Sequence, residues 1–159
     1  MVSDDEVKVN ETSLVETAAG DLVAFSRSGG FKDHGVIVRS RDRGKTWEPW
    51  QDSGIIGHPY HALRLPDDRI FLVYGYRHEP YGVRARLLDP DCRCLNTEEL
   101  IIRDDGVSGD VGYPWSCLTA DGKVLVVYYI NMNRDIVGID RTGDSGLGAC
   151  HIAAARVEV

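Results

Sequence analysis

Three side chains in this sequence are of the types that proton transfer and the binding of an anion use. The carboxylate Glu11 precedes Arg27 by sixteen residues (27 − 11). The phenol Tyr113 lies in a later repeat of the sequence, at the position equivalent to that of Glu11. A carboxylate can accept a proton, and a phenol can give one up and attack an electrophilic carbon. An arginine fork binds a carboxylate through two parallel hydrogen bonds.

The elements that must position these side chains form an internal repeat of strand, turn and strand. Three such units cover residues 11–27, 59–74 and 113–128. Their turn positions Gly20, Asp68 and Gly122 are 48 and 54 residues apart (68 − 20 and 122 − 68). A period near fifty, built from strands with no evident helix, is typical of propeller blades with four strands each. The fold class predicted from the sequence is therefore all-β.

The topology of such a blade predicts which residues share a site. In an antiparallel blade, the start of the first strand and the loop between the second and third strands lie at one end, here called the mouth. We expect eight residues to gather there: Glu11, Arg27, His58, Arg77, Arg84, Tyr113, Trp115 and Asn131. Simpler interpretations remain open for each, as a solvated strand end, a surface ion pair or a packing side chain. His58 and His61 are expected at the rim or in hydrogen bonds rather than as ligands.

One motif marks the opposite end of the blade, here called the turn end. Residues 40–47 read Ser-Arg-Asp-Arg-Gly-Lys-Thr-Trp, in which Asp42 can bond backbone N–H groups across a tight turn and Gly44 can take positive φ. A strand is predicted before the motif, at 35–39, and an edge strand after it, at 48–51. A degraded copy occupies 88–95, with an outer strand predicted at 98–103.

The motif at 40–47 resembles the Asp-box of sialidases (neuraminidases), and the whole chain resembles the C-terminal half of their six-bladed β-propeller with BNR repeats. Further matching stretches lie at 10–27, 81–86, 103–106, 112–114 and 151–154. The resemblance implies a partial propeller of about three blades, roughly 10–54, 55–108 and 109–159, that together form one domain over 1–159.

The resemblance also implies an activity, the release of a terminal anionic sugar by an exo-α-sialidase type of glycoside hydrolase. By resemblance, Tyr113 is the nucleophile and Glu11 its base, because a neutral phenol is not repelled by the carboxylate on the anomeric carbon. Among arginines, the phenol of Tyr113 is expected to ionise more easily. Arg27 and Arg84 would hold the substrate carboxylate, with Arg77 as the alternative to Arg84.

The same resemblance predicts His58 and Trp115 as further substrate-binding residues and requires no cofactor. The first arginine and the acid/base aspartate lie in the family's N-terminal half, which this chain lacks. We therefore expect the chain by itself to be inactive. A non-catalytic propeller that binds a glycan or a protein is the alternative function.

The composition of the chain limits the kinds of partner it is expected to bind. The 159 residues are 43% hydrophobic with a net charge of −7, which fits a globular domain and argues against nucleic acid. No apolar run approaches the roughly 20 residues of a membrane helix, and the acidic start does not resemble a signal peptide. Unfinished sheets would expose strand edges and favour self-association.

The four cysteines have mostly structural interpretations. Cys92 and Cys94 are too close in sequence for an ordinary disulfide, and a zinc site formed by this pair with a histidine is a weaker alternative. Cys117 and Cys150 lie in apolar, strand-like runs, and they are predicted to be buried thiols.

Overall fold

The computed structural model describes residues 6–132 and 149–159, and within these ranges every regular element is a β-strand. The first sheet holds β1 (Lys8–Glu16), β2 (Leu22–Gly29), β3 (His34–Ser40) and β4 (Gln51–Ile56). The second sheet holds β5 (Tyr60–Arg64), β6 (Ile70–Tyr76), β7 (Tyr81–Leu88) and β8 (Glu99–Gly106). The third sheet holds β9 (Gly112–Leu118), β10 (Val124–Met132) and β11 (Ala149–Val157). The all-β prediction is confirmed.

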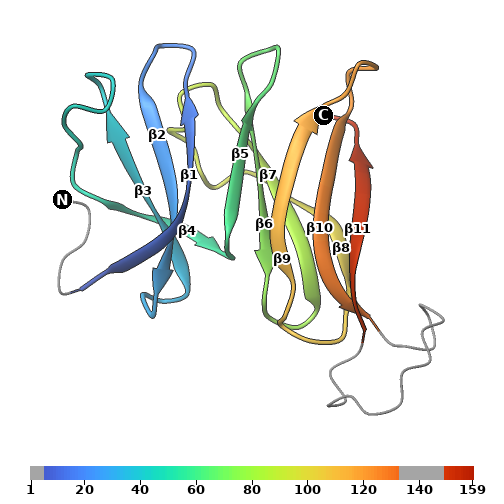
Figure 1. Ribbon diagram of the computed structural model, residues 1–159. Coiled ribbons are helices and arrows are strands. Elements are labelled where there is room, and N and C mark those ends of the chain that lie inside the picture. The colour runs from blue at the N-terminus through green and yellow to red at the C-terminus, as the bar shows by residue number, and fades with distance from the viewer. Residues whose placement is uncertain (1–5, 133–148) are drawn as a thin grey trace.

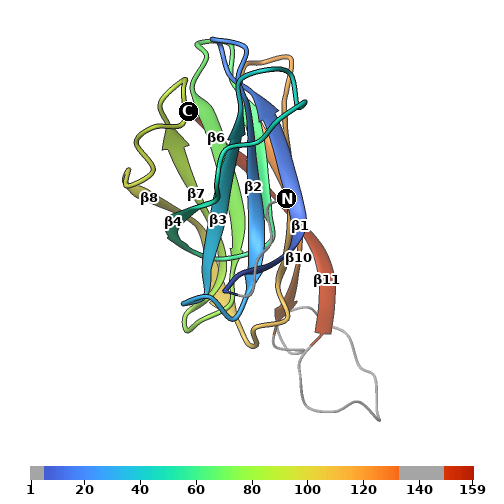
Figure 2. The same cartoon turned by 90° about the vertical axis from the view of Figure 1, so that its left-hand side faces the viewer.

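All three sheets are antiparallel, and in each the strands follow the chain order from one edge to the other. The first strands, β1, β5 and β9, lie beside one another, so the sheets meet along one side (Figure 1). In the view from the first sheet, the other two lie behind it (Figure 2). This is how the blades of a β-propeller pack, although the described residues do not close a ring.

Two apolar layers join the sheets because strands in the middle sheet are buried on both faces. Along β6, Leu72 and Tyr74 face the first sheet while Phe71 and Val73 face the third, as the two-residue period of a strand requires. All four of these side chains are 0% exposed. Each large apolar side chain buried in this way contributes about 1.5–3 kcal/mol.

The connection from β3 to β4 is a turn organised by one carboxylate. Asp42 accepts hydrogen bonds from the Thr46 backbone N–H at 2.8 Å, the Thr46 hydroxyl at 2.6 Å and the Ser40 hydroxyl at 2.9 Å. The Ser40 hydroxyl oxygen in turn accepts the Gly44 N–H at 2.8 Å. In the degraded copy, Asp89 plays the same part, accepting the N–H groups of Arg93 at 2.9 Å and of Cys94 at 2.6 Å.

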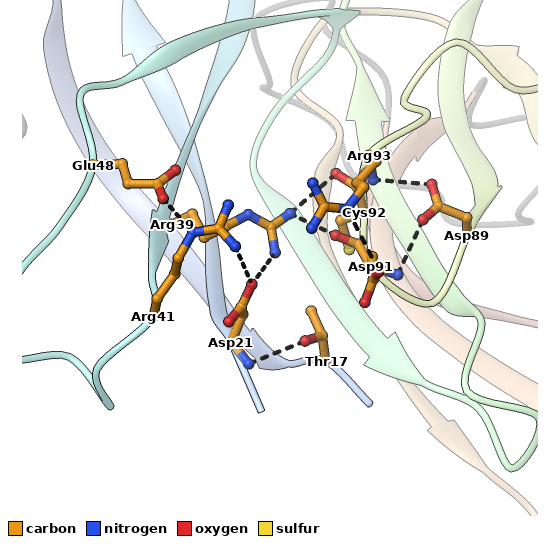
Figure 3. Close-up of polar contacts among 9 residues, drawn as sticks. All are labelled: Thr17, Asp21, Arg39, Arg41, Glu48, Asp89, Asp91, Cys92 and Arg93. Carbon is orange, nitrogen blue, oxygen red and sulfur yellow. Dashed lines mark hydrogen bonds and ion pairs between the residues drawn. The ribbon is translucent and has the colours of Figure 1, made fainter. Parts of the chain in front are cut away.

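Arg39 ties these two turns together across the first and second sheets (Figure 3). Its guanidinium donates to Asp21 at 3.0 Å and to the backbone oxygen of Asp91 at 2.5 Å. The Arg39 and Asp21 side chains are only 11% and 15% exposed. Arg41 adds an exposed ion pair with Glu48, with 2.6 Å between Nε and Oε1.

Three local predictions need correction. The edge strand expected at 48–51 begins only at Gln51, because the Glu48 N–H bonds the Arg39 oxygen at 2.8 Å and keeps residues 46–50 within the turn. Cys117 and Cys150 are exposed and not buried, because both lie on the face of the third sheet opposite its packed core. The run of polar residues at 131–135 predicts a loop, but Asn131 and Met132 belong to β10, and residues 133–135 lie outside the described residues.

Candidate functional site

Glu11 and Tyr113, 102 residues apart in the sequence, meet at the mouth. The Tyr113 hydroxyl donates a hydrogen bond to Glu11 Oε1, and Arg27 Nη1 donates to Glu11 Oε2 at 2.8 Å. Glu11 comes from β1 of the first sheet and Tyr113 from β9 of the third, while Arg27 lies near the end of β2. A carboxylate thus sits between a phenol and a guanidinium, with one oxygen toward each.

The backbone is strained at both ends of this contact. Glu11 has φ of 31° and Tyr113 has φ of 45°, in the left-handed region that non-glycine residues rarely occupy. Both residues lie inside strands, and a break in strand register falls beside each, at Asn10/Thr12 and at Val127/Tyr129. Such bulges redirect a side chain, and strain of this kind is concentrated at functional sites.

The charges around Glu11 keep its carboxyl ionised. Partial burial raises its pKa, but hydrogen bonds from Arg27 and Tyr113 and the positive charges of Arg27 and Arg77 outweigh this, so the pKa lies below its ordinary value. The pKa of Tyr113 is raised, chiefly because its hydroxyl donates to Glu11. This corrects the expectation of an easily ionised phenol: Glu11 stabilises the protonated form and is placed to accept the proton.

Of the two alternative arginines, Arg77 belongs to this group and Arg84 does not. Arg84 is 3% exposed, and its guanidinium donates to the backbone oxygens of Arg103 at 2.5 Å and Pro80 at 3.1 Å. It also lies over the Tyr76 ring, 4.8 Å from the centroid. A register break at Val83/Arg84 accompanies this inward orientation. Arg84 thus reaches the β6–β7 loop at the mouth end through Pro80, but its guanidinium is buried and bound to backbone oxygens rather than to Glu11 or Tyr113.

Arg77 is held by neutral acceptors. Its Nε donates to the Val111 backbone oxygen at 3.0 Å, and its Nη2 donates to the Tyr129 hydroxyl at 3.4 Å. Within residues 6–132 and 149–159, no carboxylate lies within ion-pair distance of it. Its positive charge nevertheless helps to lower the pKa values of Glu11 and His58 and opposes the rise in the pKa of Tyr113, so it is close to all three.

His58 lies at the same end and is 8% exposed. Its Nε2 is 3.7 Å from Asp33, whose other oxygen is 2.5 Å from His78 Nε2. Burial, together with Arg27 and Arg77, lowers the pKa of His58, so the neutral imidazole is favoured. His58 Nδ1 is buried without a hydrogen-bond partner, which leaves an unused polar atom beside the site.

Trp115 lies two residues after Tyr113 and is 69% exposed. Its ring packs on His61, with 4.1 Å between the centroids, and His61 Nδ1 is 2.9 Å from the Ser116 hydroxyl. This matches the expectation of a hydrogen-bonded His61. Trp115 thus offers an open aromatic surface beside Tyr113, of the kind on which a sugar ring can pack.

Sequence reasoning missed two residues behind Tyr113. The Tyr129 ring stacks on that of Tyr113, with centroids 6.0 Å apart and planes at 25°, and its hydroxyl donates to Asp110 at 2.8 Å. Asn131, which was expected at the mouth, donates to the other oxygen of Asp110 at 3.1 Å. The alternation along β10 could have placed Tyr129 and Asn131 on one face, but nothing in the sequence points to Asp110.

Other site types find no support in the part of the chain that is described. No group of three or more histidines, cysteines, aspartates or glutamates there could hold a metal ion. No helix in those ranges is long and apolar enough to span a membrane.

Comparison with known proteins identifies the fold and leaves the family open. No protein-family model and no curated protein matches the chain. A crystal structure of a protein of unknown function from Dyadobacter fermentans DSM 18053 is 44% identical with a TM-score of 0.84, and the match covers 98% of this chain. The chain spans only 39% of that protein.

Two more distant structures are sugar-cleaving enzymes by their descriptions. A thermostable family-43 glycoside hydrolase matches at 10% identity and TM-score 0.61, over 99% of this chain and 52% of its own. A Bifidobacterium bifidum s17 protein assigned as an exo-beta-1,3-galactanase matches at 12% identity and TM-score 0.56, over 82% and 46%. The chain is therefore an all-β protein with the blade-like sheets of β-propeller glycoside hydrolases. At these identities the likeness concerns the fold alone.

Proposed function

We propose that the mouth is part of the active site of a sialidase-like glycoside hydrolase, which releases a terminal sugar that carries a carboxylate. One observation carries the proposal: the Tyr113 hydroxyl donates to Glu11, and both residues are held in strained backbone conformations. A phenol next to a carboxylate base is a nucleophile suited to an anomeric carbon that bears a negative group.

The proposed reaction has two steps. The Tyr113 oxygen attacks the anomeric carbon and its proton passes to Glu11, while the bond to the leaving group breaks and the leaving oxygen takes a proton from solvent. Water then attacks the anomeric carbon and loses a proton to solvent, the bond to Tyr113 breaks, and Glu11 returns its proton to the phenol oxygen, which frees the sugar. Tyr113 is protonated at rest because its pKa is raised. Its proton therefore passes to Glu11 during the attack, while negative charge develops on the phenol oxygen.

Arg27 and Arg77 are proposed to hold the substrate carboxylate. Arg77 has no carboxylate partner in the described ranges, so an incoming anion would meet a guanidinium that is already positioned. Arg27 also forms an ion pair with Glu11, so it orients the proposed base in addition to binding the substrate. Charge-assisted hydrogen bonds of this type are about twice as strong as neutral ones. Trp115 would pack on the sugar ring, and His58 would border the site.

A reagent that bypasses proton donation tests the proposal on this chain. A sialyl fluoride with a second fluorine at C3 needs no general acid, because fluoride leaves unaided, and the C3 fluorine slows hydrolysis of the covalent intermediate. Mass spectrometry of the labelled peptides should find the adduct on Tyr113. Tyr113→Phe should give none, while Tyr81→Phe, a tyrosine on β7, should label like the wild type.

Two other outcomes separate the alternatives. If no adduct forms but the chain binds sialic acid better than its methyl ester, the mouth is a non-catalytic glycan-binding site. If the chain neither reacts nor discriminates between acid and ester, the proposal fails.

A further inference from the structure

We infer that Tyr129 is a positioning residue for two side chains of the proposed active site. Its ring orients the proposed nucleophile Tyr113, and its hydroxyl orients Arg77, which is proposed to bind the substrate carboxylate. The inference rests on the proposed function, because it assigns a role within that site. Tyr129 lies on β10 directly opposite Gly112, next to the register break that turns Tyr113 out of the strand. It contacts the phenol and the guanidinium at the same time.

The ring contact fixes the plane of Tyr113. Because the two rings are stacked within 25° and are 6.0 Å apart, Tyr129 limits rotation of the exposed Tyr113 side chain toward the third sheet. Tyr113 is 56% exposed and otherwise bonds only Glu11 through its hydroxyl among the contacts seen in the described ranges. Glu11 thus holds the oxygen of the phenol, and Tyr129 holds its ring.

The hydroxyl contact depends on where the Tyr129 proton points. The Tyr129 hydroxyl donates to Asp110 Oδ1 at 2.8 Å, so its oxygen lone pairs remain free to accept from Arg77 Nη2 at 3.4 Å. Asp110 is fixed in turn by Asn131, whose Nδ2 donates to Oδ2 at 3.1 Å and to the Asp110 backbone oxygen at 3.2 Å.

The arrangement separates an anion from a cation. Tyr129 stands between the Asp110 carboxylate and the Arg77 guanidinium and bonds both, which keeps them from forming an ion pair with each other. Without the hydroxyl, Asp110 would lose a donor and Arg77 an acceptor, and the two charges would attract each other directly. A neutralised Arg77 would bind a substrate carboxylate less well.

The test compares Tyr129→Phe with Tyr128→Phe. Tyr128 is the preceding residue on β10 and is buried in the core on the opposite face, so the control removes the same atom from the face that does not carry the contacts with Tyr113 and Arg77. The probes are free sialic acid and its methyl ester, titrated against the full chain by NMR. The preference of the wild type for the acid should fall about tenfold in Tyr129→Phe, the size of a lost charge-assisted contact. It should be unchanged in Tyr128→Phe.

A second readout needs no ligand. The Arg77 Nε–H resonance, assigned from its loss in Arg77→Lys, should shift in Tyr129→Phe and stay in place in Tyr128→Phe. If the wild type prefers the acid and Tyr129→Phe retains the full preference, the inference is overturned while the proposed function stands. If the wild type shows no preference, the proposed function fails as a carboxylate site. The Arg77 resonance then decides alone, and an unshifted signal refutes the positioning role.

Discussion

The charged and polar side chains at the two ends of the sheets differ in how fully they are paired. At the turn end, Arg39 is matched by Asp21 and bound to the neighbouring turn, and Asp42 accepts three hydrogen bonds. At the mouth, Arg77 has only neutral acceptors among the described residues, and His58 Nδ1 has no partner. Satisfied polar groups stabilise a fold, whereas unsatisfied and strained ones persist where a ligand uses them.

The backbone repeats this contrast. Positive φ at the turn end falls on turn residues such as Arg43, Gly44 and Cys92, where reversal of the chain requires it. At the mouth it falls on the loop residues Lys32 and Asp33 and also on Glu11 and Tyr113, which are strand residues and gain nothing from it locally. The turn end is therefore the stabilising half of the molecule, and the mouth is the half that can do chemistry.

The largest loss of stability should follow Arg39→Met. It removes a largely buried cation that joins two sheets, and Arg41, 3.6 Å away, is then the remaining ion-pair partner of Asp21 among the described residues. Breaking a buried ion pair costs several kcal/mol, and the remaining partner reduces this to about 2–3 kcal/mol. Urea denaturation measures the free energy of unfolding, and a loss below about 0.5 kcal/mol would refute the bridging role.

Loss of either turn carboxylate should lower the melting temperature by several degrees. Asp42→Ala and Asp89→Ala each leave backbone N–H groups of a turn without their acceptor. Asp67→Ala is the matched control, because Asp67 lies in the turn between β5 and β6, where its bond to a backbone N–H is long, at 3.3 Å, and its 2.6 Å ion pair with Arg69 is exposed. Equal melting temperatures for all three variants would contradict the special role of the two turns.

A smaller effect that depends on pH is expected for Glu11→Gln. The pKa of Glu11 in the folded protein lies below the ordinary value of 4.5, so its stabilising contribution is present above about pH 4.5. That contribution is lost as the pH falls through the lowered pKa. The difference in melting temperature between wild type and Glu11→Gln should thus be largest near neutral pH and shrink in acid. A difference that grows below pH 4 would show that Glu11 is not held as a carboxylate.

The smallest effect on folding is expected at the outer face of the third sheet. Ile152→Lys replaces a 73% exposed apolar side chain, so the free energy of unfolding should change by no more than about 0.5 kcal/mol. The face also exposes Val127 at 38%, and exposed apolar faces and open strand edges favour association. We expect the wild type to associate at micromolar concentration in light scattering and Ile152→Lys to associate less. A monomeric wild type would contradict this.

The sequence predicts the architecture better than the details of the mouth. Strand–turn–strand repeats and the carboxylate of each turn are local patterns, so the sheets and the turn at 40–47 were predictable. Whether a strand face is covered depends on neighbours that a strand's own residues do not reveal, and so Cys117 and Cys150 were misplaced. Blade topology placed Arg84 at the mouth, but the burial of its side chain accompanies the register break at Val83/Arg84, which is a matter of strand pairing.

Glu11 and Tyr113 were placed at one end from the equivalence of their repeats, and the structure does bring them together. Their positive φ was not foreseeable, because a non-glycine residue inside a strand normally has an extended backbone with negative φ. The hydrogen bond between Tyr129 and Asp110 could not be predicted either, because it joins a strand to a loop through side chains alone.

The division between a stabilising turn end and a working mouth is tested most directly by comparing two arginine variants in two measurements. Arg39→Met and Arg77→Met are each assayed for thermal stability and for binding of sialic acid relative to its methyl ester. We expect Arg39→Met to melt several degrees lower while it keeps the preference for the acid, and Arg77→Met to melt near the wild type while it loses that preference. The opposite pattern, or equal losses of stability in both variants with the preference intact, would contradict the account.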